Sequence, residues 1–125
     1  MSQDLPRISD RYSAEDIESF YQTGYWTTQT LIDMVDDWAS KRPSDIFVTD
    51  ASTALAFAEL RDRAYRTAAG LARSGIKAGD RVVVQLPNWT DFVAAVVAVA
   101  RCRAIVVPIM PIYRHDEVGY ILRHS

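Results

Sequence analysis

Residues 81–107 constrain the fold most, because two short β-rich runs enclose a helical segment that is apolar on nearly every side. Residues 81–86 hold three consecutive valines, and continuous rather than alternating apolarity is typical of a strand buried on both faces. Residues 104–107 form a second continuous run. The segment 89–101 between them has the composition of a helix covered on most sides. Strand, helix and strand in this order predict a parallel βαβ unit with a right-handed crossover.

Proline and capping residues mark the boundaries of this unit. Pro87 breaks the first strand, Pro108 closes the second, and Asn88 or Thr90 is the expected N-cap of the helix between them. A last helix is expected over residues 114–123, with its apolar side chains on one side. Such a unit normally delivers the chain into a third strand that covers the sheet edge, and none follows here. The sequence therefore predicts an incomplete α/β unit.

The residues before this unit predict a helix and a β-hairpin. The helix begins after an N-cap at Thr27 or Thr28 and ends before Pro43. Residues 46–50 and 55–57 are short β-like runs that predict two antiparallel strands.

A second helix follows the hairpin, and Gly75 is expected to end it in the left-handed conformation. Its apolar stripe repeats at helical spacing and consists of Leu60, Ala64, Ala68 and Leu71. Residues 1–26 are expected to be an irregular segment that packs on the domain, with a short helix starting at Ser13. Residues 27–125 are expected to form a partial N-terminal subdomain.

Composition excludes several classes of protein. The 125 residues suit one domain, and the net charge of −2 supplies no basic excess for binding nucleic acid. A single cysteine forms no intramolecular disulfide and favours a cytoplasmic location. Arg101 and Arg103 separate the two longest apolar runs, which argues against a membrane span.

The sequence offers no constellation of catalytic or metal-binding residues. His115 and His124 lie nine positions apart on one expected helix and so do not share a face. Cys102 is interpreted as a packed thiol at a helix end. The five glycines are isolated, and neither a dinucleotide-binding nor a P-loop pattern occurs.

A family resemblance is carried by three blocks of the sequence. In chain order they are LAFAELRDRAYRTAAGL, GIKAGDRVVVQLPNWTDFVAAVVAVARC and AIVVPIMPIYRHDEVGYILRHS. They resemble the N-terminal region of AMP-forming acyl-CoA synthetases, in the adenylate-forming family of AMP-dependent synthetases and ligases. The third block is most similar to ligases of cyclic, aromatic or medium-chain acids. The resemblance covers about residues 26–125. It implies an α/β fold, an incomplete N-terminal subdomain with a β-hairpin and a parallel βαβα unit.

The resemblance implies a function for a full-length parent in fatty acid metabolism. Such enzymes use ATP and Mg²⁺ to form an acyl-adenylate, and then transfer the acyl group to coenzyme A. The family's nucleotide loop, ATP-binding aspartate and catalytic lysine lie downstream of the matched region. We therefore expect this chain to contain no catalytic residue, bound cofactor or metal site, and to be inert by itself. Arg114 lies close to the position where some relatives place a basic residue near the coenzyme A nucleotide, and a phosphate contact is expected of it. The implied partner is the missing downstream part or a self-associating copy.

Two departures from the family pattern predict lower stability. Arg103 replaces a glycine that would suit a left-handed helix stop, at a cost on the order of 1 kcal/mol. Ala56 replaces a threonine whose hydroxyl would cap a helix, which costs around 1 kcal/mol. Two alternatives stay open beside the ligase fragment, a stand-alone α/β interaction module and a small-ligand binder that uses the crevice at the ends of the strands.

Overall fold

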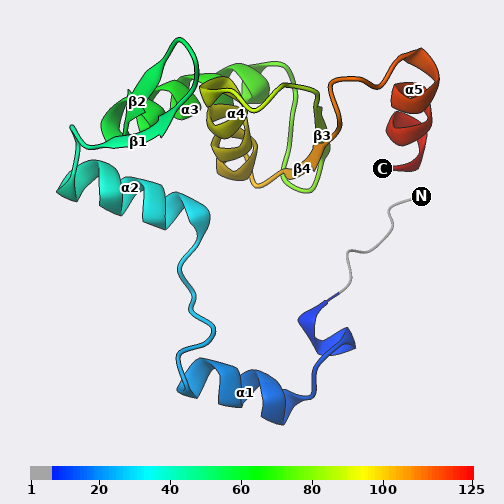
Figure 1. Ribbon diagram of the computed structural model, residues 1–125. Coiled ribbons are helices and arrows are strands. Elements are labelled where there is room, and N and C mark those ends of the chain that lie inside the picture. Colours follow the sequence, from blue (N-terminus) through cyan, green and yellow to red (C-terminus); the bar gives the residue numbers. More distant parts are fainter. Residues whose placement is uncertain (1–6) are drawn as a thin grey trace.

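The computed structural model describes residues 7–125, in which three helices are followed by a strand pair and then by alternating helices and strands (Figure 1). The elements are η1 (Ile8–Asp10), α1 (Ala14–Gln22), α2 (Leu31–Lys41), β1 (Ile46–Thr49), β2 (Ala54–Ala56), α3 (Phe57–Arg73), β3 (Arg81–Val84), α4 (Thr90–Arg101), β4 (Ile105–Pro108) and α5 (His115–His124). This order confirms the expected α/β class. No helix in residues 7–125 combines the length and the apolarity that crossing a membrane requires.

The core lies where α2, α3 and α4 meet. Ala64 and Ala98 are fully buried, and such small side chains let α3 and α4 approach closely. One buried cluster joins Val35, Ala64 and Val97, one residue from each of the three helices. A second cluster joins the hairpin to the helices and consists of Leu55, Leu60 and Ala94.

The strands form two separate pairs. β1 and β2 form an antiparallel hairpin, and β3 and β4 form a parallel pair in which Arg81 faces Ile105 and Val84 faces Pro108. Both pairings were expected from the sequence. Burial of β3 and β4 on both faces was also expected, but only Val84 is fully buried. The remaining side chains are partly or fully exposed because α4 packs against this pair without a complete second layer.

The structure corrects the expected N-cap of α2. Neither Thr27 nor Thr28 caps it, because Thr30 forms a reciprocal pair with Asp33. The Asp33 N–H donates to the Thr30 hydroxyl at 3.2 Å, and the Asp33 carboxylate accepts from the Thr30 N–H at 2.8 Å. A threonine three residues before an aspartate forms a reciprocal pair that satisfies two backbone donors. Thr27 and Thr28 do not form such a pair.

The N-cap of α4 also differs from expectation. Trp89 occupies the N-cap position and has no capping side chain, so neither Asn88 nor Thr90 serves as the cap. Instead the Thr90 N–H donates to the Asp50 carboxylate, which lies 40 positions earlier, at 2.9 Å. The helix start is therefore satisfied from the hairpin rather than from its own flank.

Helices α3 and α4 end in the same way, and the left-handed conformation expected at both ends is confirmed. Gly75 has φ of 98° and Arg103 has φ of 57°. After each helix, the backbone N–H groups of two successive residues return to carbonyls of its last turn, as Gly75 to Ala72 and Arg103 to Ala100 show. This pattern is a Schellman motif, and glycine is its usual left-handed residue.

Residues 12–26, which we call the N-terminal arm, contain α1. The helix begins at Ala14, directly after Ser13, which is its N-cap: the Ser13 hydroxyl accepts from the Asp16 N–H at 3.1 Å, so the expected helix start at Ser13 is confirmed. In Figure 1 the arm lies apart from α2, α3 and α4, joined to α2 by an extended connection. The domain boundary after residue 26 stays a prediction. Packing of the first 26 residues on the domain also stays a prediction, and residues 1–6 lie outside the residues that the structure describes.

Helix α5 lies at the opposite end of the chain, beyond β4 (Figure 1). It contains no buried residue, and Leu122, expected on its apolar side with Val118 and Ile121, is 59% exposed. Val118 and Ile121 are half-buried, so the elements of residues 7–125 cover the apolar face of α5 only in part.

Candidate functional site

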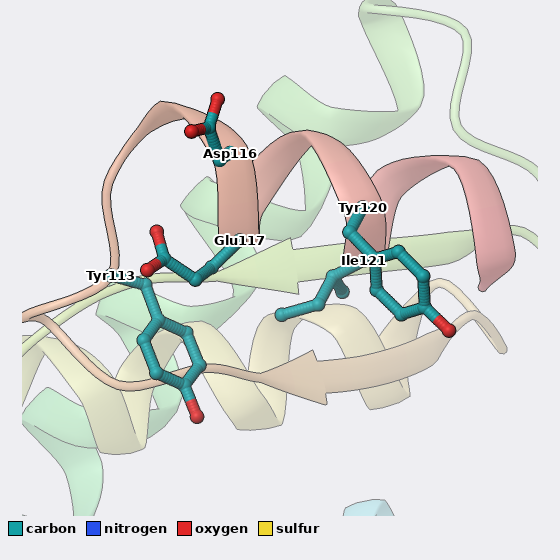
Figure 2. Close-up of a pocket in the computed structure, with 5 residues that line it drawn as sticks. All are labelled: Tyr113, Asp116, Glu117, Tyr120 and Ile121. Carbon is teal, nitrogen blue, oxygen red and sulfur yellow. The ribbon is translucent and has the colours of Figure 1, made fainter.

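An open pocket of about 520 Å³ lies along α5 and the turn before it. Its lining consists of Tyr113, Asp116, Glu117, Tyr120 and Ile121 (Figure 2). Figure 2 shows the Tyr113 and Tyr120 rings on either side of Ile121, and Asp116 directed away from the rings. The pocket combines two aromatic rings with carboxylates at its rim, and it is open to solvent.

Backbone donors hold Glu117 at the start of α5. Its own N–H and the Arg114 N–H, which donates to its carboxylate at 3.0 Å, lower the pKa of Glu117 below its ordinary value. Glu117 is exposed and ionised at neutral pH, and it serves to cap the helix.

Gln85 anchors the turn that leads into α5. Its side-chain amide nitrogen donates to the Met110 carbonyl at 3.2 Å and to the Tyr113 carbonyl at 2.9 Å. One side chain just after β3 thus holds the turn after β4, where the carboxyl ends of the two parallel strands meet. Sequence reasoning missed Gln85, because its partners are backbone carbonyls 25 and 28 positions away.

The structure places Arg114 at the N-cap position of α5, with an exposed side chain. Its guanidinium donates to the Pro111 carbonyl at 3.3 Å. Gln85 therefore holds the backbone just before Arg114, whereas the guanidinium hydrogen-bonds a neutral carbonyl and its charge also helps to lower the pKa of Glu117. The expected contact between Arg114 and a coenzyme A phosphate stays a prediction.

A second pocket, of about 350 Å³, lies where the hairpin turn meets the start of α4, and Asp50 organises it. One carboxylate oxygen accepts from the Thr90 N–H, and the other accepts from the Ser52 and Thr53 N–H groups at 2.9 Å each. The Thr90 and Ser52 hydrogen bonds together hold the pKa of Asp50 well below its ordinary range. The sequence indicated only a hairpin turn at Asp50, because its partner in α4 is distant.

The chemistry-bearing residues singled out from the sequence lie apart. Among residues 7–125, no three His, Cys, Asp or Glu side chains converge on a possible metal position. His115 contacts Asp116 at 3.1 Å in full solvent, and His124 stacks on Tyr120 with ring centroids 4.0 Å apart. The Cys102 thiol lies 3.5 Å from the Ala68 carbonyl, between α3 and α4.

Comparison with known proteins gives a consistent set of matches. The family described as "AMP-binding enzyme" matches residues 35–125. A salicyl-AMP ligase / salicyl-S-ArCP synthetase of Mycobacterium tuberculosis is 39% identical over 114 residues, covering 87% of this chain and 20% of the relative. A 2,3-dihydroxybenzoate-AMP ligase of Bacillus subtilis is 38% identical over 103 residues, covering 82% of this chain and 19% of the relative.

A solved structure agrees with these sequence matches. The apo structure of Mycobacterium smegmatis MbtA superposes with a TM-score of 0.79 at 37% identity, covering 90% of this chain and 21% of that one. The chain thus spans about a fifth of the length of the relatives it matches. The matched part is the N-terminal part of these ligases.

Proposed function

Because the chain belongs to the family of AMP-binding enzymes and corresponds to the N-terminal part of adenylate-forming ligases, we propose that it forms the first portion of a ligase for aromatic carboxylic acids. The observation that carries this proposal is the 39% identity to a salicyl-AMP ligase over most of the chain. The two relatives described above act, by name, on salicylate and 2,3-dihydroxybenzoate, which favours the aromatic acids among the cyclic, aromatic and medium-chain acids expected, and argues against a role in fatty acid metabolism.

The proposed reaction joins a carboxylate to AMP. A carboxylate oxygen attacks the α-phosphorus of ATP, and the bond to the β-phosphate oxygen breaks to release pyrophosphate. Because the family resemblance implies that the nucleotide loop and the ATP-binding aspartate lie downstream, we assign ATP and Mg²⁺ binding to residues outside this chain. Residues 7–125 bring together no group of three His, Cys, Asp or Glu side chains that could hold a metal ion. The role of this chain is to supply the α2–α4 scaffold and the ends of β3 and β4, and alone it is inert.

The acyl acceptor that follows adenylation is proposed to be a thiol, either coenzyme A or a carrier protein. Arg114, at the exposed start of α5, is our candidate for a phosphate contact if the acceptor is coenzyme A. In the complete ligase, Arg114→Ala is expected to raise the KM for coenzyme A about three- to tenfold, because one charge-assisted phosphate contact is lost. The rate of ATP–pyrophosphate exchange should stay unchanged. Arg123→Ala, at the exposed end of α5, is the matched control, and equal KM values for both variants would contradict the assignment.

The test of the proposed function uses the native polypeptide that carries this sequence. An antibody raised against the chain isolates that polypeptide, its mass is measured, and its ATP–pyrophosphate exchange is assayed with salicylate, 2,3-dihydroxybenzoate, benzoate and octanoate. We expect a polypeptide several times heavier than 14.1 kDa that exchanges with the hydroxybenzoates, from a cytoplasmic fraction. The purified 125-residue chain is the control and should show no exchange.

Two outcomes would redirect the proposal. Exchange with octanoate alone would keep the ligase and overturn the aromatic substrate. A native polypeptide of 14.1 kDa without exchange would favour the second candidate function, an interaction module. The exposed apolar face of α5, with Leu122 59% exposed, is the observation that favours this second candidate.

A further inference from the structure

Side chains from two different elements hold the turn between β4 and α5. The Gln85 amide, just after β3, donates to the Met110 carbonyl at 3.2 Å and to the Tyr113 carbonyl at 2.9 Å. The Arg114 guanidinium, at the start of α5, donates to the Pro111 carbonyl at 3.3 Å. Because Pro111 lies between the two residues that Gln85 contacts, Gln85 and Arg114 hold the same piece of backbone.

Apolar packing gives this turn little support. None of residues 110–113 is buried, and Met110 and Ile112 are 52% and 67% exposed. Hydrogen bonds make the link to β3 instead. The Gln85 amide contacts the turn twice, and the Ile109 N–H donates to a carbonyl of β3 at 3.0 Å. The position of the turn therefore depends on Gln85 more than on burial.

The hydrogen bonds of Gln85 fix geometry rather than stabilise the fold. Gln85 is exposed, so its amide and the two carbonyls exchange hydrogen bonds to water for hydrogen bonds to one another, and the net gain is small. Both carbonyls must however face the same amide nitrogen, which restricts the shape of the turn. A binding segment that is already held in one shape loses less entropy when a ligand arrives. This arrangement indicates a role in binding.

The group that the turn positions is the Arg114 guanidinium. The turn lies at the carboxyl ends of β3 and β4, where α/β sheets bind their ligands. The Arg114 N–H donates to the Glu117 carboxylate at 3.0 Å, so the backbone is fixed on both sides of Arg114. Its side chain is exposed, and its hydrogen bond to Pro111 leaves its other N–H groups to a ligand. An exposed guanidinium on a fixed backbone suits a phosphate group.

We propose that Gln85 is a positioning residue, which holds the turn before α5 so that Arg114 contacts a phosphate of the thiol acceptor. The acceptor chemistry is phosphopantetheine, which coenzyme A and a carrier protein both present. This inference rests on the proposed function, because it requires a complete ligase that transfers an acyl group to a thiol.

The test measures acyl transfer by the complete ligase to three thiols. Coenzyme A and phosphopantetheine carry phosphate, whereas pantetheine carries none. Gln85→Met keeps the length of the side chain and removes its donors. We expect the KM for the phosphate-bearing thiols to rise about threefold, because Arg114 is no longer held in place. The kcat, the KM for pantetheine and the rate of ATP–pyrophosphate exchange should stay unchanged.

The two phosphate-bearing thiols identify the source of the phosphate. A higher KM for both would place the contact at the phosphate that coenzyme A shares with a carrier protein. A higher KM for coenzyme A alone would place it at the nucleotide phosphates. Either result supports the positioning role of Gln85.

Two further single variants separate the loss of the donors from other changes. Gln85→Glu keeps the shape of the side chain, but its carboxylate repels the two carbonyls, so the KM should rise at least as much as in Gln85→Met. Gln22→Met is the matched control, because it also removes an exposed side-chain hydrogen bond, of 2.8 Å to Glu18 in α1, and it should change no KM.

A double variant shows whether Gln85 acts through Arg114. In the Arg114→Ala ligase, Gln85→Met should raise the KM no further, because the contact that Gln85 positions is already absent. Effects of the two substitutions that add in full would contradict this.

The contrary outcomes fall into two groups. In an active ligase, an unchanged KM in Gln85→Met, an equal rise with pantetheine, a loss of ATP–pyrophosphate exchange in that variant, or transfer to none of the three thiols would each overturn the positioning proposal and leave the proposed function standing. A complete polypeptide without exchange that depends on an aromatic acid would overturn the proposed function, and this inference with it.

Discussion

Arg103 has an unfavourable backbone conformation at the end of α4. It is the single non-glycine residue with positive φ among the residues that the structure describes. At φ of 57° its Cβ crowds the backbone, and the left-handed conformation costs roughly 1–2 kcal/mol for a residue with a side chain. The Schellman hydrogen bonds after α4 hold it there, and they compensate for part of this cost.

Arg103→Gly should therefore stabilise the protein. We expect the free energy of unfolding to rise by about 1 kcal/mol, which raises Tm by a few degrees in a chain of this size. Thermal unfolding followed by circular dichroism measures the change. Arg103→Ala is the matched control, because it removes the guanidinium but keeps the Cβ, and its Tm should stay near that of the wild type. A lower Tm for Arg103→Gly would contradict the strain argument.

Ala56 leaves α3 without a capping hydroxyl. The Glu59 carboxylate accepts from the Ala56 N–H at 2.9 Å, so half of a capping box is present. Ala56→Thr should complete the box and raise the free energy of unfolding by about 1 kcal/mol, as measured by chemical denaturation. Ala54→Thr, on the exposed part of the same strand, is the control and should change stability less. Equal effects of the two substitutions would show that the hydroxyl does not cap the helix.

Among the elements, the hairpin and α4 are joined through Asp50. Its carboxylate ends the β1–β2 turn with one oxygen and satisfies the Thr90 N–H at the start of α4 with the other. The salt bridge from Arg63 on α3 to Asp91 on α4, at 2.7 Å, lies beside this contact. Asp50 therefore couples the hairpin to the helical core, and its contribution depends on its charge.

The pH dependence of stability should reveal this contact. The lowered pKa of Asp50 means that its contribution is complete above the pKa of the unfolded state, near 4, and is lost as pH falls toward the lower pKa of the folded state. Asp50→Asn should lower Tm by several degrees at pH 7, and the difference from wild type should narrow below about pH 4. Asp62→Asn, in an exposed pair with Arg66, is the control and should have a smaller effect. A Tm difference that does not vary with pH would argue against an ionic cap.

At the scale of the complete chain, apolar surface collects at the C-terminal end. Met110 is 52% exposed, Ile112 is 67% exposed and Leu122 is 59% exposed, all in or just before α5. The β3–β4 pair also has two strands only, so each strand has an edge without a partner among residues 7–125. Exposed apolar groups and strand edges both favour association with another chain.

The isolated chain should therefore self-associate as its concentration rises. Sedimentation velocity over a range of concentrations measures this, and we expect the average mass to increase. Leu122→Lys should shift association to higher concentration, because a charge on the apolar face must be desolvated on contact. Ile8→Lys, at a similarly exposed position (53% in the wild type) in η1, is the control. A monomer at every concentration, or equal effects of the two variants, would contradict this use of α5.

Local patterns in the sequence were sufficient to predict the helical stripes, the hairpin, the parallel pair and the left-handed end at Gly75, whereas the left-handed end at Arg103 was expected from the family resemblance. Most of these features depend on side-chain periodicity and on hydrogen bonds between residues a few positions apart, whereas the parallel pair was predicted from the order strand, helix, strand. Two errors lie at the helix starts, where Thr30 rather than Thr27 or Thr28 caps α2 and no local residue caps α4. A third concerns β3 and β4, which are less buried than their continuous apolar runs predicted.

Contacts between distant residues needed the folded chain. Asp50 reaches α4 across 40 positions, and Gln85 reaches the turn before Arg114 across 25 and 28. The arm and α5 are likewise exposed because the core formed by α2, α3 and α4 does not extend to them. Such contacts arise when packing of α2, α3 and α4 brings remote segments together, and no periodicity along the chain encodes that proximity.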